Sequence, residues 1–73
     1  MNLIAIAKAY IDCVELEERL QRDHSSVAED ASILRADLHA LLMDALRQAQ
    51  IQFTDRSDAA RLALQISQGQ PIA

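Results

Sequence analysis

Residues 1–68 contain neither glycine nor proline, because the chain holds one of each, Gly69 and Pro71. Hairpins of β-strands depend on such turn-forming residues, so a strand-based fold is disfavoured. Thirteen alanines and ten leucines make up much of the apolar content, and both residue types favour helices. A chain of 73 residues has room for one domain at most. We therefore predict a single all-α domain over residues 1–73.

A heptad pattern of apolar residues runs through the first two thirds of the chain. Position a holds Leu3, Tyr10, Ala31, Leu38 and Ala45, and position d holds Ile6, Cys13, Leu20, Val27, Leu34 and Leu41. Glu17 and His24 interrupt position a, and Ser26 with Glu29 has the spacing of a capping box. We therefore predict helices at about 3–23 and 27–52, paired as an antiparallel hairpin. One uninterrupted helix stays open as an alternative, because the heptad phase continues across the break.

A third, shorter helix is predicted at about 55–68. The run from Thr54 to Asp58 offers N-cap residues and early acids, while Gly69 and Pro71 provide the stop signal. Its apolar face is Ala59, Leu62, Ala63 and Ile66.

A second apolar stripe widens one end of each long helix. It comprises Ile4, Ala7, Ile11 and Val14 in the first helix and Leu42, Leu46, Ala49 and Phe53 in the second. In an antiparallel hairpin these ends lie side by side and form a groove that the third helix can fill. The other end carries Glu18, Gln21, Ser32, Arg35 and His39 at the corresponding positions. We expect a compact three-helix end and a polar projecting end.

Two features predict contact with a partner. Asp23, Asp30, Asp37 and Asp44 recur every seven residues and form an acidic edge that could attract a basic surface. Leu16, Ile33, Met43 and Leu64 lie outside the apolar faces described above, so some of them are expected to be contact surface. The acidic edge, with Leu16, Ile33 and Met43, forms the predicted partner-binding set.

The sequence offers few residues that could form a catalytic or metal-binding site. Cys13 lies in the heptad seam, so we expect a buried, reduced thiol rather than a nucleophile. The two histidines, His24 and His39, fall short of an ordinary metal site even together with that cysteine. We predict no enzyme activity, no metal and no cofactor.

Size and charge favour a binding protein. A core this small rarely supplies more than about 3–5 kcal/mol, and a lone cysteine cannot form an intrachain disulfide, so we expect the domain to self-associate or to dock on a partner. The net charge of −4 disfavours nucleic acid. The segment 1–11 lacks a leading basic region and is too short to span a bilayer, so a cytoplasmic protein without membrane attachment is expected.

The leading hypothesis is a small regulator or adaptor, of the inhibitor, anti-activator or chaperone type, that docks on a larger protein through helical apolar and acidic surfaces. The excess of six arginines over one lysine weakly indicates a bacterial or phage origin. Two alternatives stay open. One is a DNA-binding regulator that uses helices two and three, with Arg56 and Arg61 toward phosphate, and the other is a purely structural helical oligomer or dimer.

Overall fold

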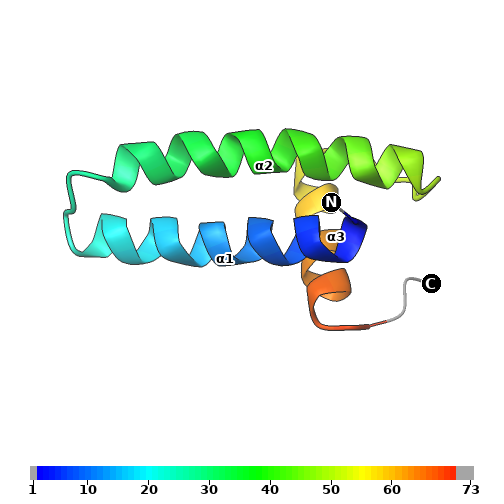
Figure 1. Ribbon diagram of the computed structural model, residues 1–73, viewed down its shortest axis with the longest axis horizontal. Helices are drawn as coiled ribbons and strands as arrows, with labels where there is room; N and C mark the ends of the chain where they lie inside the picture. Colours follow the sequence, from blue (N-terminus) through cyan, green and yellow to red (C-terminus); the bar gives the residue numbers. More distant parts are fainter. Residues whose placement is uncertain (1, 71–73) are drawn as a thin grey trace.

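The computed structural model describes residues 2–70 and contains three helices, α1 (Leu3–Arg22), α2 (Ala28–Gln48) and α3 (Arg56–Ser67). The helices α1 and α2 run antiparallel as a hairpin, and α3 crosses one side of it near the amino end of α1 (Figure 1). The predicted all-α hairpin with a short third helix is confirmed. The alternative of one uninterrupted helix is wrong.

Side chains cap the starts of two helices. The Asn2 Oδ1 atom accepts a hydrogen bond of 2.8 Å from the backbone N–H of Ala5 at the start of α1. At the start of α3, Asp55 accepts from the N–H of Asp58 at 2.8 Å, and the Asp58 carboxylate accepts from the N–H of Thr54 at 3.0 Å. This reciprocal capping satisfies backbone donors that a helix leaves unpaired, and it confirms the predicted start of the third helix.

The predicted capping box at the start of α2 is wrong. Val27 occupies the N-cap position and makes no side-chain capping bond. The preceding turn is held instead by Ser25, whose Oγ accepts from the N–H of Val27 at 3.3 Å. Ser26 is therefore displaced from the position in which it could cap the helix.

All three helices end in the same hydrogen-bonded motif. A residue with positive φ follows each C-cap: His24 (53°), Gln50 (61°) and Gly69 (72°). In α2 the N–H of Gln50 bonds the carbonyl of Arg47, and the N–H of Ile51 bonds the carbonyl of Leu46, which is a Schellman motif. It ends α2 at Gln48 rather than near residue 52 as predicted, so Phe53 lies in the connection to α3. Pro71, the second part of the predicted stop signal, lies outside the described residues.

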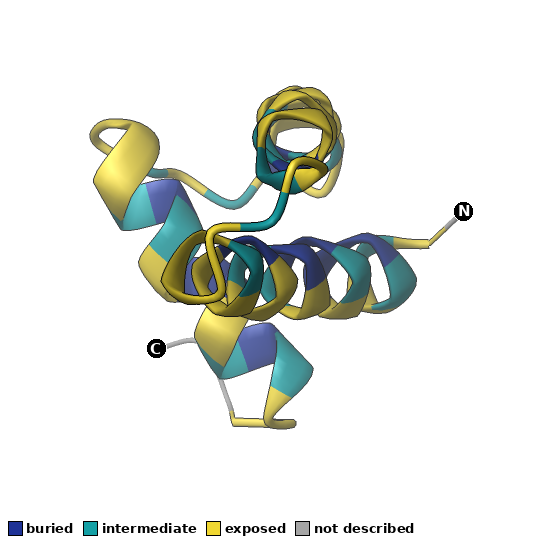
Figure 2. Ribbon diagram, turned by 90° about the vertical axis from the view of Figure 1, so that its left-hand side faces the viewer, coloured by how far each residue is buried: buried dark blue, intermediate teal, exposed yellow. Residues whose placement is uncertain are grey.

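The core forms where the three helices meet (Figure 2). Its buried members are Ile6, Ala7, Tyr10, Leu42, Leu46, Ala59, Leu62, Ala63 and Ile66. Leu42 and Leu46, from the predicted second stripe, have no exposed surface at all. The compact three-helix end is thus confirmed, although Ile4 of the same predicted stripe is 54% exposed and lies outside it.

The heptad assignment of α2 needs a correction. Val27, Leu34 and Leu41 were expected in the buried seam, and each is about half exposed, at 48%, 50% and 51%. The helix is rotated so that Leu42 and Leu46 occupy the centre of its buried side. The physical reason is that α2 packs on both α1 and α3. Its buried side therefore points between these two helices and does not coincide with the heptad seam.

Candidate functional site

An ion pair holds the hairpin together at its projecting end. The Arg35 Nε atom donates to Glu17 Oε1 at 2.9 Å, and Glu17 is 9% exposed. The pKa of the Glu17 carboxyl is lowered, first by the Ser32 hydroxyl and then by the Arg35 guanidinium. Glu17 was predicted only as a break in the heptad seam. It is instead a largely buried contact between α1 and α2.

His39 was expected on the polar end of the hairpin, and it is buried, with 5% of its surface exposed. Its ring centroid lies 5.0 Å from that of Tyr10, and its Nε2 atom lies 3.0 Å from the carbonyl oxygen of Arg56. A carbonyl can only accept, so Nε2 carries the proton and Nδ1 is left buried with no hydrogen-bond partner among the described residues. Burial lowers the pKa of this imidazole. The side chain therefore joins α1, α2 and the start of α3 as a neutral group.

Cys13 is buried as expected, and its Sγ lies 3.6 Å from the carbonyl oxygen of Ala31. Burial raises the pKa of the thiol, and the nearby Glu17 carboxylate raises it further. A thiol in this environment stays protonated at neutral pH and serves as packing material.

One side of the hairpin is covered by α3 and the other side is not. In α2, Ala31 lies against α1 and His39 contacts α3. Because successive residues advance by about 100° around a helix, Leu34 and Leu41 project on the side of the α1 contact opposite to His39. Leu41 accordingly lines a shallow hollow with Ile6 of α1.

The matching side chains of α1 lie on the same uncovered side. Cys13 and Glu17 contact α2, and Val14 packs toward the core, so Leu16 projects in the direction opposite to Val14. We call this side the open face. It is formed by exposed Leu16, Val27, Leu34 and Leu41, with half-buried Leu20 and Leu38 between them.

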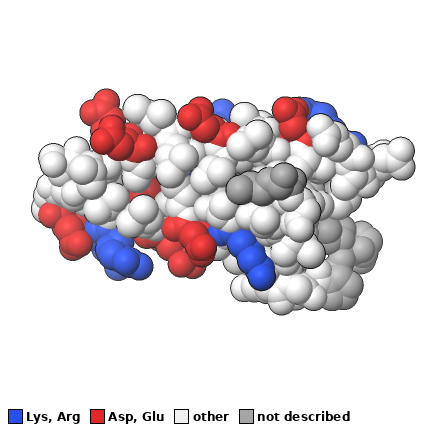
Figure 3. Space-filling model, viewed as in Figure 1, with Lys and Arg blue, Asp and Glu red and all other residues white. Residues whose placement is uncertain are grey.

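The open face has an acidic border along α2. Asp30, Asp37 and Asp44 are exposed and seven residues apart, so they follow one line at intervals of about 10 Å. The view of Figure 3 looks onto the open face and shows an uncharged band along the hairpin, with mainly acidic groups and some basic ones over α2 on one border. Both signs of charge lie over α1 on the other border (Figure 3). Asp44 pairs with Arg47 at 3.2 Å, whereas Asp30 and Asp37 have no ion pair within residues 2–70.

The structure brings part of the predicted partner-binding set together. Asp30, Asp37, Asp44 and Leu16 border or belong to the open face, and Asp23 is the C-cap of α1 at the hairpin connection. Ile33 is 58% exposed but points about 100° away from Leu34, outside that face. Met43 is half-buried and packs on the core. Leu64, on α3, is 44% exposed.

Sequence reasoning missed Leu34 and Leu41 as candidate contact residues because the heptad placed both in the buried seam. The signal that could have found them was the apolar stripe of Leu42 and Leu46. Two stripes on one helix cannot both face the same neighbour, so one of them had to be left for another contact.

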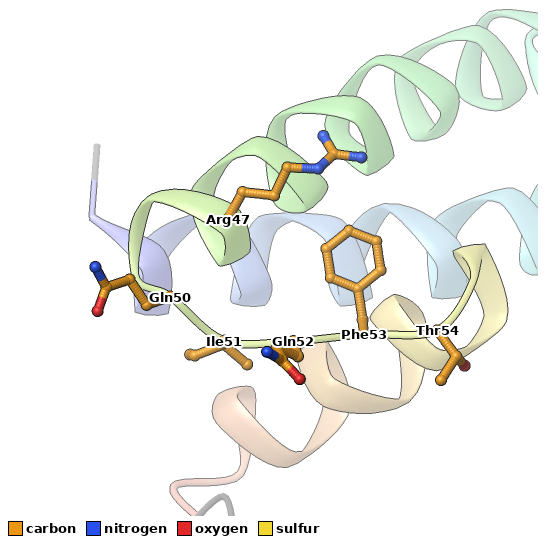
Figure 4. Close-up of a pocket in the computed structure, with 6 residues that line it drawn as sticks. All are labelled: Arg47, Gln50, Ile51, Gln52, Phe53 and Thr54. Carbon is orange, nitrogen blue, oxygen red and sulfur yellow. The ribbon is translucent and has the colours of Figure 1, made fainter.

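A hollow of about 590 Å³ lies beside the connection from α2 to α3, lined by Arg47, Gln50, Ile51, Gln52, Phe53 and Thr54. Figure 4 shows Arg47 and Phe53 pointing toward one another, and the guanidinium carbon lies 5.3 Å from the ring centroid. Arg47 is the one charged side chain of this lining, and it already bonds Asp44. The charge of Arg47 is thus already paired beside this hollow.

The residues proposed for the DNA-binding alternative, Arg56 and Arg61, lie at the start and in the middle of α3. Arg61 is bonded to Asp58, with Nε at 3.0 Å and Nη2 at 2.6 Å from the same carboxylate oxygen. Arg56 is exposed, and its backbone carbonyl accepts the hydrogen bond from His39 Nε2. The Arg61 guanidinium is therefore already paired with a carboxylate of its own helix.

Among residues 2–70, no helix is both long and apolar enough to cross a membrane. In the same residues, no three or more histidine, cysteine, aspartate or glutamate side chains gather in a group that could hold a metal ion.

Comparisons with protein-family models, with curated proteins and with solved structures find no match to this chain.

Proposed function

We propose that this protein is a non-catalytic regulator or adaptor that binds a larger protein through the open face. The proposal rests on one observation above all: Leu34 and Leu41, two large aliphatic side chains in line on α2, are half exposed on the side of the hairpin that α3 leaves uncovered. A contiguous apolar surface bordered by polar groups is characteristic of protein interaction sites.

Energy considerations support the same proposal. Burial of a leucine or valine side chain contributes about 1.5–3 kcal/mol, so a partner that covered the half-exposed Leu16, Val27, Leu34 and Leu41 would contribute on the order of 4 kcal/mol. A small domain has a total stability of only about 3–5 kcal/mol. The contact energy available at the open face is therefore comparable to the stability of the domain itself.

The border of the face supports a specific rather than an indiscriminate contact. Asp30 and Asp37 lie beside the apolar band and carry no ion pair within residues 2–70. Charges around an apolar centre select partners and accelerate encounter more than they add affinity. An adaptor or inhibitor needs such selectivity.

The test compares two neighbouring residues of α2. The tagged full chain, Leu34→Glu and Ile33→Glu are used to capture partners from a lysate of the source organism, and circular dichroism first establishes that both variants keep the parent's helix content. Both changes place a carboxylate on an exposed position, but only Leu34 belongs to the open face. We expect one dominant partner with the parent and with Ile33→Glu, and its loss with Leu34→Glu. A partner retained by Leu34→Glu, lost equally from both variants, or absent with the parent would refute the proposal.

A further inference from the structure

We infer that the occupant of the open face is an amphipathic helix of a partner protein that carries lysine or arginine at seven-residue intervals along one flank. This inference rests on the proposed function and adds the chemistry of the partner.

The shape of the open face fits a helix. It lies between two antiparallel helices of 20 and 21 residues, each about 30 Å long. Val27, Leu34 and Leu41 repeat at seven residues, the spacing with which one helix presents side chains to another. A helix of about 20 residues laid along the open face would contact the whole row.

The charges on the border specify the flank of that helix. Asp30, Asp37 and Asp44 share the seven-residue repeat of Val27, Leu34 and Leu41. They lie beside that row along the α2 border of the open face. Asp30 and Asp37 are without an ion pair among residues 2–70, and the Asp44–Arg47 pair is an exposed contact of 3.2 Å that a stronger pairing could replace. A partner helix with a basic residue in each heptad would set one cation opposite each aspartate. On the α1 border, where Lys8, Asp12 and Arg19 are all exposed, neither sign of charge is favoured.

A second copy of this chain fits the charges less well. With the two-fold axis across the helices, the aspartate rows of both copies would meet. With the axis along the helices, α2 of one copy would lie over α1 of the other. That arrangement sets the aspartate row against the mixed charges of the α1 border, and two copies that each carry a net charge of −4 repel one another. A basic helix has neither conflict.

The experiment uses the full chain and two synthetic peptides of three heptads. Both peptides carry leucine at the first and fourth positions of each heptad. One carries lysine at a single flanking position, and the other carries glutamate there. Binding is measured by calorimetry at low salt and again in about 1 M salt, where the screening length falls to about 3 Å.

We expect the lysine peptide to bind about tenfold more tightly than the glutamate peptide, as three exposed charge pairs together predict. High salt should remove most of that preference. Asp37→Lys should also reduce it, whereas Glu29→Lys, the same charge change on the far side of α2, should leave it intact. Equal affinity of the two peptides, or an equal effect of the two variants, would overturn the inference.

Sedimentation analysis of the peptide-free chain tests the second copy directly. A dimer at micromolar concentration that is strengthened by Asp37→Lys and dissociated by Leu34→Glu would overturn the inference, because the face would then be covered by another copy. The proposed function fails separately, through the lysate comparison of Leu34→Glu with Ile33→Glu. If that comparison succeeds while the lysine peptide is not preferred, the partner binds the open face without a basic helix.

Discussion

The rotation of α2 predicts opposite outcomes for two adjacent leucines. Leu42 has no exposed surface and is part of the core, whereas Leu41 is 51% exposed on the open face. Truncation of a fully buried leucine to alanine costs about 2–5 kcal/mol, from lost burial and from the cavity left behind. We expect Leu42→Ala to lower the free energy of unfolding by about 3 kcal/mol, within that range. Leu41→Ala should lower the free energy of unfolding by less than about 1 kcal/mol, because half of that side chain is already in water and alanine is the better helix former.

The assay is thermal and urea unfolding of both variants followed by circular dichroism. For a domain of this size, 1 kcal/mol corresponds to a Tm shift of about 4–8 °C, so Leu42→Ala should lower the Tm by about 12–24 °C. Leu41→Ala should stay within a few degrees of the parent. A register in which the heptad seam is buried would produce the reverse order, with Leu41→Ala the more damaging change. Equal losses, or that reverse order, would refute the rotation.

Four further outcomes follow from the polar and strained positions. Burial holds the pKa of His39 below its ordinary value of about 6.5, so the unfolded chain binds a proton at this side chain more readily than the folded one. The free energy of unfolding should therefore fall as the pH drops below about 6.5, and it should fall much less in His39→Gln. Urea midpoints measured at each pH would show this difference. Cys13 should react with iodoacetamide at least about tenfold more slowly in the native protein than in urea, and equal rates would contradict its burial. His24→Gly should raise stability by about 0.5–1 kcal/mol, because glycine adopts a φ of 53° without the steric penalty of a side chain; a lower Tm would speak against the Schellman motif there. Glu17→Ala should cost about 1–2 kcal/mol, because Arg35 loses its carboxylate partner, and an unchanged urea midpoint would show that the pair adds nothing.

The general architecture could be predicted because the necessary signals are local. The lack of glycine and proline before Gly69, the polar break around His24 and the acids after Phe53 define three helices without reference to their packing. The widened apolar ends likewise located the three-helix end. These signals depend on backbone propensity and on composition along one helix, both of which a single sequence contains.

The helix ends and the buried polar groups could not be predicted in the same way. His24 and Gln50 occupy positions that usually attract glycine, so their positive φ gives no compositional signal. His39 looked like a surface residue because it continues the polar positions Ser32 and Arg35. Its burial depends on Tyr10 and on a carbonyl of α3, both of which are distant from it in sequence. Such contacts depend on how the helices pack, which the periodicity of any one helix does not contain.

The heptad repeat of α2 was the most regular signal in the sequence, and yet it does not describe the buried side of that helix. A repeat of seven is typical of two helices that pack along their lengths, whereas α2 must serve two neighbours, α1 and the crossing α3. Contact with both neighbours buries Leu42 and Leu46 and turns Leu34 and Leu41 outward. If the proposed function is right, the repeat has an intermolecular meaning: its leucines and the aspartates in step with them are spaced for a helix of another protein, while a second, less regular stripe holds the domain together.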